Sequence, residues 1–309
     1  MQYLGEMISI GVAFSWTATA LLSELGSKRM GNVTLNFTRM AITLVFSAIL
    51  FWVVTGSPLP AKASTEAYLW MMLSGLVGYV IGDFCLFQCY IIIGSKYGQL
   101  FMTLAPITAA FMAWLTLGQA ISPMGIVAMA VTLTGIAITV LGRGSGHHHL
   151  SLKLPLNGVL FAIGAAVCQG VGLVLSKIGM DHYESSLAAP CQAWILPFYA
   201  NVFRCLAGIV GFAILLRFHE GFGSLRKNIT DRTSMTVATL TTIFGPFVGV
   251  GCSLLAVQYA SAGIASTLMA LTPIIIILPA WWFFKQPITP KSVIGALISV
   301  AGVSLFFLL

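Results

Sequence analysis

The chain carries one motif twice, in residues 102–123 and again in residues 269–290. At a constant spacing, both copies place Met, Leu, Pro, Ile, Trp and Gln in the same order, and both end on Pro. A unit that recurs at such a distance indicates duplication of a large part of the fold, and duplicated units in apolar chains are typical of transporters. The repeat therefore limits the fold to two halves of similar construction.

The composition indicates the environment in which this chain folds, a lipid membrane. Of the 309 residues, 58% are apolar and only 7% are charged, a balance that predicts an integral membrane protein. A helix needs about 20 apolar residues to cross the hydrocarbon core. We predict an all-α membrane protein with ten transmembrane helices, near residues 4–24, 33–55, 67–92, 97–117, 122–142, 156–177, 191–216, 235–258, 262–284 and 289–309.

The duplication extends through all five helices of each half. Asn36-x-x-Arg39 in the second helix, for example, reappears as Asn201-x-x-Arg204 in the seventh. Because each half has an odd number of spans, the second half must enter the membrane from the opposite side, which gives an inverted repeat. We predict two such five-helix repeats and a connecting loop, at residues 1–142, 156–309 and 143–155.

The chain resembles a known family in several of these features. Trp16 in the first helix, an Arg in the second and seventh helices, and a Leu-x-Pro-Ile stretch in the fourth and ninth are similar to EamA-type transporters of the drug/metabolite transporter superfamily. The resemblance implies a secondary transporter that moves a small organic solute by alternating access. It names no substrate, since such proteins carry amino acids, metabolites, sugars, nucleotide derivatives and drugs.

Two charged residues in the apolar runs predict a site inside the membrane. A charge near the bilayer centre costs at least about 2.5 kcal/mol, so Asp83 in the third helix requires an explanation. It either binds a cationic group or a coupling proton or sodium ion, or it forms a buried structural ion pair with Arg39, which we expect at a similar depth.

Arg204 has no such acid in its own half, because Cys252 stands at the position that corresponds to Asp83. Its guanidinium is therefore expected to bind helix carbonyls or an anionic group of the substrate. Gln169 and Trp16 occupy the place where small multidrug exporters of the same superfamily carry a proton-exchanging Glu. Both halves thus lack that carboxylate.

The remaining site predictions follow from the helices that, by resemblance, line a central cavity. We predict paired gating kinks at Pro106 and Pro273, which occupy matching positions and interrupt the helical hydrogen bonds. The predicted substrate-binding residues are Trp16, Asp83, Gln169, Arg204, Met102 and Met269.

The sequence contains no phosphate-binding loop, no His-Glu-x-x-His and no Ser-His-Asp arrangement, so we predict neither an enzyme nor a cofactor. No metal site is expected, because no His joins the closely spaced Cys85 and Cys89. Two alternatives remain, namely a flippase for lipid headgroups and an intramembrane enzyme in which Asp83 is half of an aspartyl pair. The expected partners are a small solute and the lipid bilayer, with no nucleic acid, and the chain is expected to be a monomer or homodimer.

The basic residues of the loops bear on orientation. Most of them fall on the side of the membrane opposite to both termini, and the positive-inside rule then places the termini outside. EamA-type proteins more usually have cytoplasmic termini, so the orientation stays open. We expect a multi-pass protein of a bacterial inner membrane.

Overall fold

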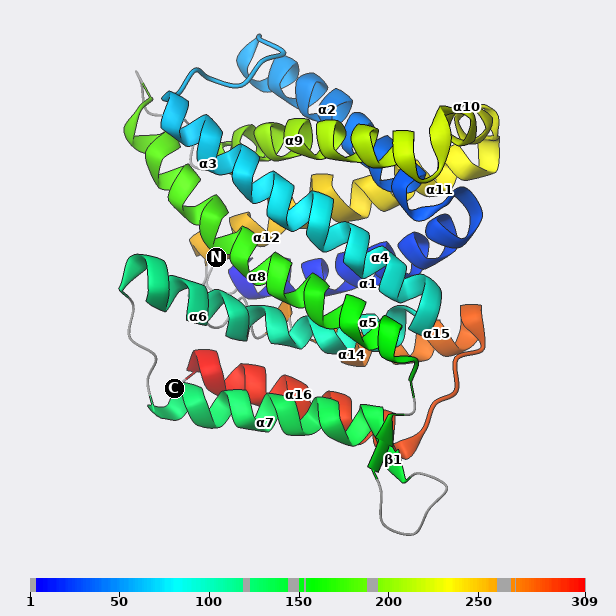
Figure 1. Cartoon of the computed structure of the whole chain (residues 1–309). Helices are drawn as coiled ribbons and strands as arrows, with labels where there is room; N and C mark the ends of the chain where they lie inside the picture. Colours follow the sequence, from blue (N-terminus) through cyan, green and yellow to red (C-terminus); the bar gives the residue numbers. More distant parts are fainter. Residues whose placement is uncertain are drawn as a thin grey trace.

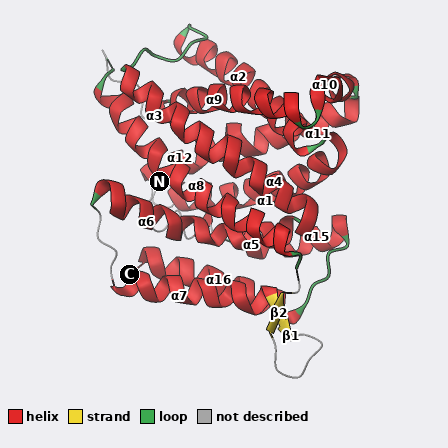
Figure 2. Ribbon diagram, in the orientation of Figure 1, coloured by secondary structure: helices red, strands yellow, loops and turns green. Residues whose placement is uncertain are grey.

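The computed structural model is an assembly of helices with one short two-stranded hairpin (Figures 1 and 2). The described residues are 4–118, 123–143, 150–152, 154–187, 194–259, 268–269 and 271–308.

The first half contains helices and helical segments in the order α1 (Leu4–Met30), α2 (Asn32–Thr55), α3 (Thr65–Gly75), η1 (Leu76–Asp83), α4 (Phe84–Ile93), α5 (Ser95–Phe101), η2 (Met102–Leu104), α6 (Ala105–Leu117) and α7 (Pro123–Val140). The hairpin of β1 (Leu141–Arg143) and β2 (Leu150–Leu152) follows. The second half contains α8 (Leu156–Ser185), α9 (Leu196–Phe218), α10 (Gly221–Thr230), α11 (Arg232–Thr242), η3 (Ile243–Phe247), α12 (Val248–Tyr259), α14 (Thr272–Ile275), α15 (Ile277–Phe284) and α16 (Pro290–Leu308).

Within the described residues, seven helices are long and apolar enough to cross a membrane, and three further apolar helices are shorter. Each of the ten overlaps one of the runs predicted from sequence, but a count of ten spans stays a prediction. The starts of the predicted runs 122–142, 191–216 and 262–284 lie outside the described residues. The seven helices are Leu4–Met30, Asn32–Thr55, Thr65–Ile93, Ser95–Thr116, Leu156–Ser185, Leu196–Phe218 and Arg232–Ser253.

Several predicted boundaries were wrong. The first helix continues to Met30 instead of ending near 24, because basic residues in its last turn suit the negative end of a helix. The sixth helix likewise runs to Ser185. The gap between the predicted runs 191–216 and 235–258 contains α10. Parts of the hairpin lie in the predicted linker 143–155, whose bounds stay a prediction.

Corresponding helices of the two halves pack against each other in antiparallel directions. In α7 and α16, a methyl group added to Gly135 would lie 2.4 Å from the Ser299 hydroxyl, and one added to Gly302 would lie 2.3 Å from that of Thr132. These contacts are reciprocal, since Thr132 corresponds to Ser299 and Gly135 to Gly302 in the repeat. Small residues permit this close approach of two membrane helices.

The second corresponding pair, α2 and α9, has the same arrangement. Near one end of the pair, the Phe51 and Tyr199 rings lie 4.7 Å apart, and further along, Met40 packs against Gly208. Later residues of α2 therefore contact earlier residues of α9, so the two helices are antiparallel. Opposite directions in corresponding helices are what an inverted repeat requires.

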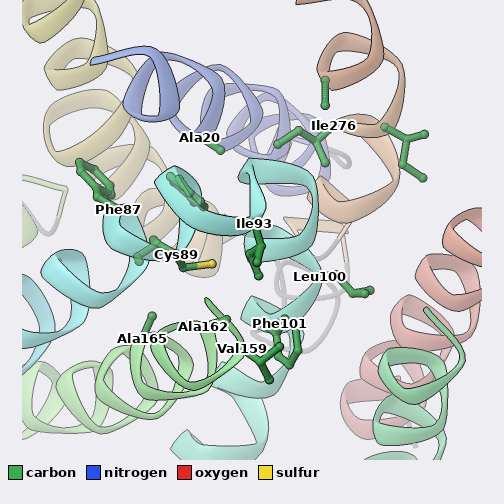
Figure 3. Close-up of a cluster of buried hydrophobic side chains, with 14 of the residues drawn as sticks. Ala20, Phe87, Cys89, Ile93, Leu100, Phe101, Val159, Ala162, Ala165 and Ile276 are labelled. Carbon is green, nitrogen blue, oxygen red and sulfur yellow. The ribbon is translucent and has the colours of Figure 1, made fainter. Parts of the chain in front are cut away.

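Apolar contacts fill the space between the two halves (Figure 3). The largest cluster joins Phe87, Ile93 and Leu100 of the first half to Val159 of α8 and Ile276 beside α15. Because lipid is as apolar as these side chains, such contacts stabilise the fold through close packing.

Polar contacts join the halves at the end of the molecule where α1 stops. The Glu220 carboxylate accepts hydrogen bonds from the backbone N–H groups of Val33 and Thr34, at 3.0 and 2.8 Å, and so caps α2. Asp231 pairs with Arg29 at 2.9 Å. Hydrogen bonds from Ser234 and Arg29 hold the pKa of Asp231 at about 2, so this contribution to stability is present above pH about 4 and is lost as the pH falls toward 2.

We expect Glu220→Ala to lower the stability of the protein by about 1–2 kcal/mol, because it removes the cap of α2. The measurement is the midpoint of thermal unfolding in detergent. Glu184→Ala, which removes an exposed acid, is the matched control and should leave the midpoint unchanged. Equal midpoints for both variants would show that Glu220 does not stabilise α2.

Candidate functional site

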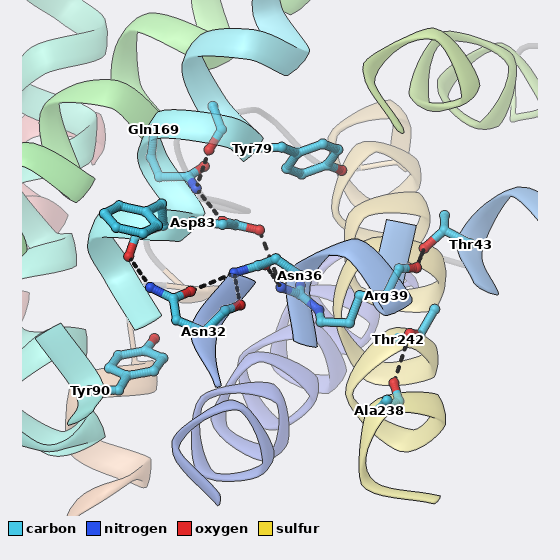
Figure 4. A network of polar contacts seen from close by, with 12 residues as sticks. Asn32, Asn36, Arg39, Thr43, Tyr79, Asp83, Tyr90, Gln169, Ala238 and Thr242 are labelled. Atoms are coloured by element: carbon cyan, nitrogen blue, oxygen red, sulfur yellow. Dashed lines mark hydrogen bonds and ion pairs between the residues drawn. The ribbon is translucent and has the colours of Figure 1, made fainter. Parts of the chain in front are cut away.

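A cluster of polar side chains lies between the two halves, with Asp83 at its centre (Figure 4). Asp83 is 5% exposed and ends the π-helical segment η1. One carboxylate oxygen accepts a hydrogen bond from Gln169 Nε2 of α8 at 2.8 Å, and the other pairs with Arg39 Nη1 of α2 at 3.3 Å. Residues of both halves therefore bind this one carboxylate.

Arg39 is held by further contacts within the first half. Its Nη1 donates to Asn36 Oδ1 at 2.8 Å, and its guanidinium lies 4.6 Å from the centre of the Phe87 ring. Asn36 in turn donates to Asn32 Oδ1 at 2.9 Å (Figure 4). Because buried charges are tolerated only when paired and hydrogen-bonded, this chain of contacts explains how Arg39 is accommodated.

Arg204, the counterpart of Arg39, has different surroundings. Its guanidinium lies 4.5 Å from the centre of the Tyr79 ring, and the Tyr79 hydroxyl donates to Asn201 Oδ1 at 2.6 Å. Asn201 therefore binds Tyr79, whereas its counterpart Asn36 binds an arginine. Among the described residues, the Arg204 side chain has no carboxylate within ion-pair distance, and its buried Nε has no hydrogen-bond partner.

The contacts of two glycine pairs, one in each half, show that the two halves are related by approximate two-fold symmetry at this site. A methyl group added to Gly78 would lie 3.2 Å from Arg204 Nη2, and one added to Gly82 would lie 3.3 Å from Gln169 Nε2.

Two glycines of the second half, Gly245 and Gly249, face Arg39 and Trp16, the repeat counterparts of Arg204 and Gln169. This register pairs Asp83 with Val250, two residues before the Cys252 that the sequence comparison matched to it. Added methyl groups at Gly245 and Gly249 would lie 3.2 Å from Arg39 Nη2 and from the Trp16 indole. Gly78 and Gly245 belong to π-helical segments, η1 and η3, which are frequent at functional sites.

The structure brings some of the predicted site residues together and separates others. Asp83, Gln169 and Arg39 are in direct contact, and Arg204 reaches them through Tyr79. Trp16 and Met269 pack together in a second cluster on α1, α12 and the segment before α14, while Met102 packs in the large apolar cluster that joins the halves. No side-chain hydrogen bond joins these three groups among the described residues.

The two predicted kink prolines occupy equivalent places. Pro106 and Pro273 lie in the first turns of α6 and α14, each directly after a break in the α-helix. At that position the missing N–H removes no helical hydrogen bond. The helix is therefore interrupted just before each proline, and a gating role stays a prediction.

Sequence reasoning missed a second buried acid, Glu24. A long acidic side chain near the end of a membrane helix usually reaches water, but Glu24 is only 1% exposed. It accepts hydrogen bonds from Lys28 Nζ at 2.6 Å, from the Ser95 backbone N–H at 2.7 Å and from Gln286 Nε2 at 3.1 Å. Gln286 comes from the second half, so Glu24 also joins the halves.

Gly94 makes the Glu24 contacts possible. Its φ of +86° favours glycine, and an added methyl group would lie 2.4 Å from Gln286 Nε2. A glycine before Ser-Lys at the end of an apolar run was the available signal for this turn, but nothing in the sequence indicates that Gln286 packs against it.

The helix arrangement and the buried charged cluster define a multi-pass membrane protein of the transporter class. The chain belongs to the EamA-like transporter family, whose model matches residues 3–141 and 156–308, and this family is part of the drug/metabolite transporter superfamily.

Comparison with solved structures supports the fold. Matches extend to 27 chains, and one, titled only "Crystal structure of protein", is 14% identical, covers 100% of this chain and 97% of its own length, and gives a TM-score of 0.65. At that identity the likeness shows the fold alone. No curated protein matches the chain.

Proposed function

We propose that the chain is a secondary transporter that carries a small organic solute across a bacterial inner membrane by alternating access. The observation that supports it best is the Asp83 cluster, in which a buried ion pair of the first half binds Gln169 of the second half. Ionisable residues inside a membrane are expensive and usually mark the path of a substrate or ion. In inverted-repeat transporters that path lies at the interface between the repeats.

Asp83 is the residue best placed to couple solute movement to conformational change. Its two oxygens bind different halves, Arg39 of the first and Gln169 of the second. A proton or cation that binds Asp83 would weaken both contacts at once, and the weakened Gln169 contact is one that joins the two halves. We therefore assign Asp83 the coupling role and Arg39 the role of its ion-pair partner.

The test is flux in liposomes that contain purified protein. We expect a proton or sodium gradient to drive accumulation of at least one solute from a panel of amino acids and metabolites. Compared at equal amounts of monodisperse protein, Asp83→Asn should reduce this accumulation at least 10-fold. Asp181→Asn is the matched control, because Asp181 forms only an exposed pair with Lys177 at 3.4 Å. It should leave the flux unchanged.

Other outcomes would contradict this proposal in distinct ways. Gradient-driven flux that Asp83→Asn leaves intact would show that Asp83 has only a structural role. Transbilayer movement of a labelled lipid without flux of any solute would instead support a flippase.

A further inference from the structure

Three charged side chains meet in the membrane-embedded part of the protein, and their charges do not balance. Arg39 pairs with Asp83 at 3.3 Å, Arg204 interacts electrostatically with the same carboxylate, and among the described residues no other acid forms an ion pair with either arginine. Two positive charges against one negative charge leave the cluster with an excess of one positive charge. An uncompensated charge is unfavourable in a membrane interior, so a ligand that supplies a negative charge would be attracted there.

The geometry shows which arginine carries the excess. Arg39 has an ion pair with Asp83 and a hydrogen bond to Asn36. Arg204 has the same sequence context but neither partner, because Asn201 is occupied by the Tyr79 hydroxyl and no acid of the described residues lies within ion-pair distance. Its guanidinium therefore keeps donors that are free to bind an acceptor, within the described part of the chain.

The surroundings of Arg204 keep the guanidinium in one orientation. Tyr79 supports one face of the group, and Tyr79 is itself fixed through Asn201, which donates to the Pro246 carbonyl at 2.9 Å. Gly78 adds no side chain beside Arg204 Nη2. Arg204 as a whole is half-buried, although its Nε is not exposed.

On the basis of the proposed transport function, we infer that the solute carries an anionic oxygen group, a carboxylate or a phosphate, and that Arg204 binds this group. A guanidinium fork matches both groups by two parallel hydrogen bonds. Binding of the anion neutralises the cluster as long as Asp83 is ionised. In that state Arg39 stays paired with Asp83.

The first experiment measures binding to purified protein in detergent, through the shift of the unfolding midpoint with ligand concentration. The probes are matched pairs, namely phenylacetate and phenylacetamide, succinate and succinamide, and glycerol 3-phosphate and glycerol. We expect an anionic member to bind and its neutral partner to fail. Because a hydrogen bond to a charged group contributes about 1.5–3 kcal/mol, Arg204→Gln should weaken anion binding roughly 10- to 100-fold.

Two further variants keep this test decisive. Arg204→Lys retains the charge but not the fork, so it should bind the anion more weakly than the parent and more tightly than Arg204→Gln. Lys177→Gln removes an exposed cation elsewhere and should leave the affinity unchanged. Equal binding of neutral and anionic partners, no binding of any anion, or full anion affinity in Arg204→Gln would overturn the inference.

Liposome flux separates this inference from the proposed function. Anion binding that depends on Arg204, without any flux, would support the anion site and contradict the transport proposal. Flux of neutral solutes that Arg204→Gln leaves intact would support the transport proposal and contradict the anion site. A third arm measures movement of labelled phosphatidylglycerol against phosphatidylcholine, because a headgroup phosphate could present the same chemistry. Arg204-dependent movement of phosphatidylglycerol alone would assign the anion to a lipid.

Discussion

Arg39→Gln should lower the stability of the protein by about 3–5 kcal/mol, enough to prevent recovery of folded protein from the membrane. The substitution leaves Asp83, which is 5% exposed, without its ion-pair partner. The remaining hydrogen bond from Gln169 at 2.8 Å is too weak to offset the desolvation of a carboxylate. The measurements are the yield of monodisperse protein and the midpoint of thermal unfolding in detergent.

The double variant Arg39→Gln/Asp83→Asn distinguishes a lost ion pair from a general packing defect. Removal of both charges should restore most of the stability, since replacing a buried pair by neutral groups is often close to neutral. The Lys177 and Asp181 pair, which is exposed, provides a matched cycle with an expected coupling below about 1 kcal/mol. Equal losses in the single and double variants at Arg39 and Asp83 would show that the two charges do not stabilise each other.

The sequence predicted much of this arrangement because the repeat fixes correspondence between distant residues. The repeat matches Gly135 with Gly302, for instance, which anticipates that both occur in one interface. In the structure Gly135 lies against Ser299 and Gly302 against Thr132, and these two partners also correspond in the repeat. The odd number of helices in each half predicted opposite directions, and α7 and α16 have them. Arg39 and Asp83 were expected at similar depth, and Arg39 Nη1 lies 3.3 Å from Asp83 Oδ2.

The features that the sequence did not reveal depend on contacts between elements that have no local signature. In the sequence, Tyr79 is one more apolar residue of the third helix. In the structure its hydroxyl donates a hydrogen bond to Asn201 Oδ1, so this oxygen is not left for Arg204. The predicted solute residues are spread over three clusters, because position on a helix does not define which neighbour a side chain meets. The burial of Glu24 follows from Gln286, which is far away in the sequence.

If the protein alternates between two states, Glu24→Gln should increase exposure of the region between the halves about 10- to 100-fold. The Glu24 carboxylate joins α1 to the start of α5 and to Gln286 of the second half. Opening at this end must break those bonds. Charge-assisted hydrogen bonds are roughly twice as strong as neutral ones, so the neutral amide should favour the open state by about 1.4–2.8 kcal/mol.

Cys89 reports this opening from inside the protein. It is fully buried on α4, the helix that ends just before the Ser95 contact, so a maleimide can reach it only when the packed halves separate. With the other five cysteines replaced by serine, the alkylation rate of Cys89 should rise 10- to 100-fold in Glu24→Gln. Glu66→Gln, an exposed acid at the opposite end of the third helix, should leave that rate unchanged. The same alkylation rate in both variants would mean that the Glu24 bonds stay formed throughout transport, and the moving contact between the halves would then have to be the Asp83 cluster alone.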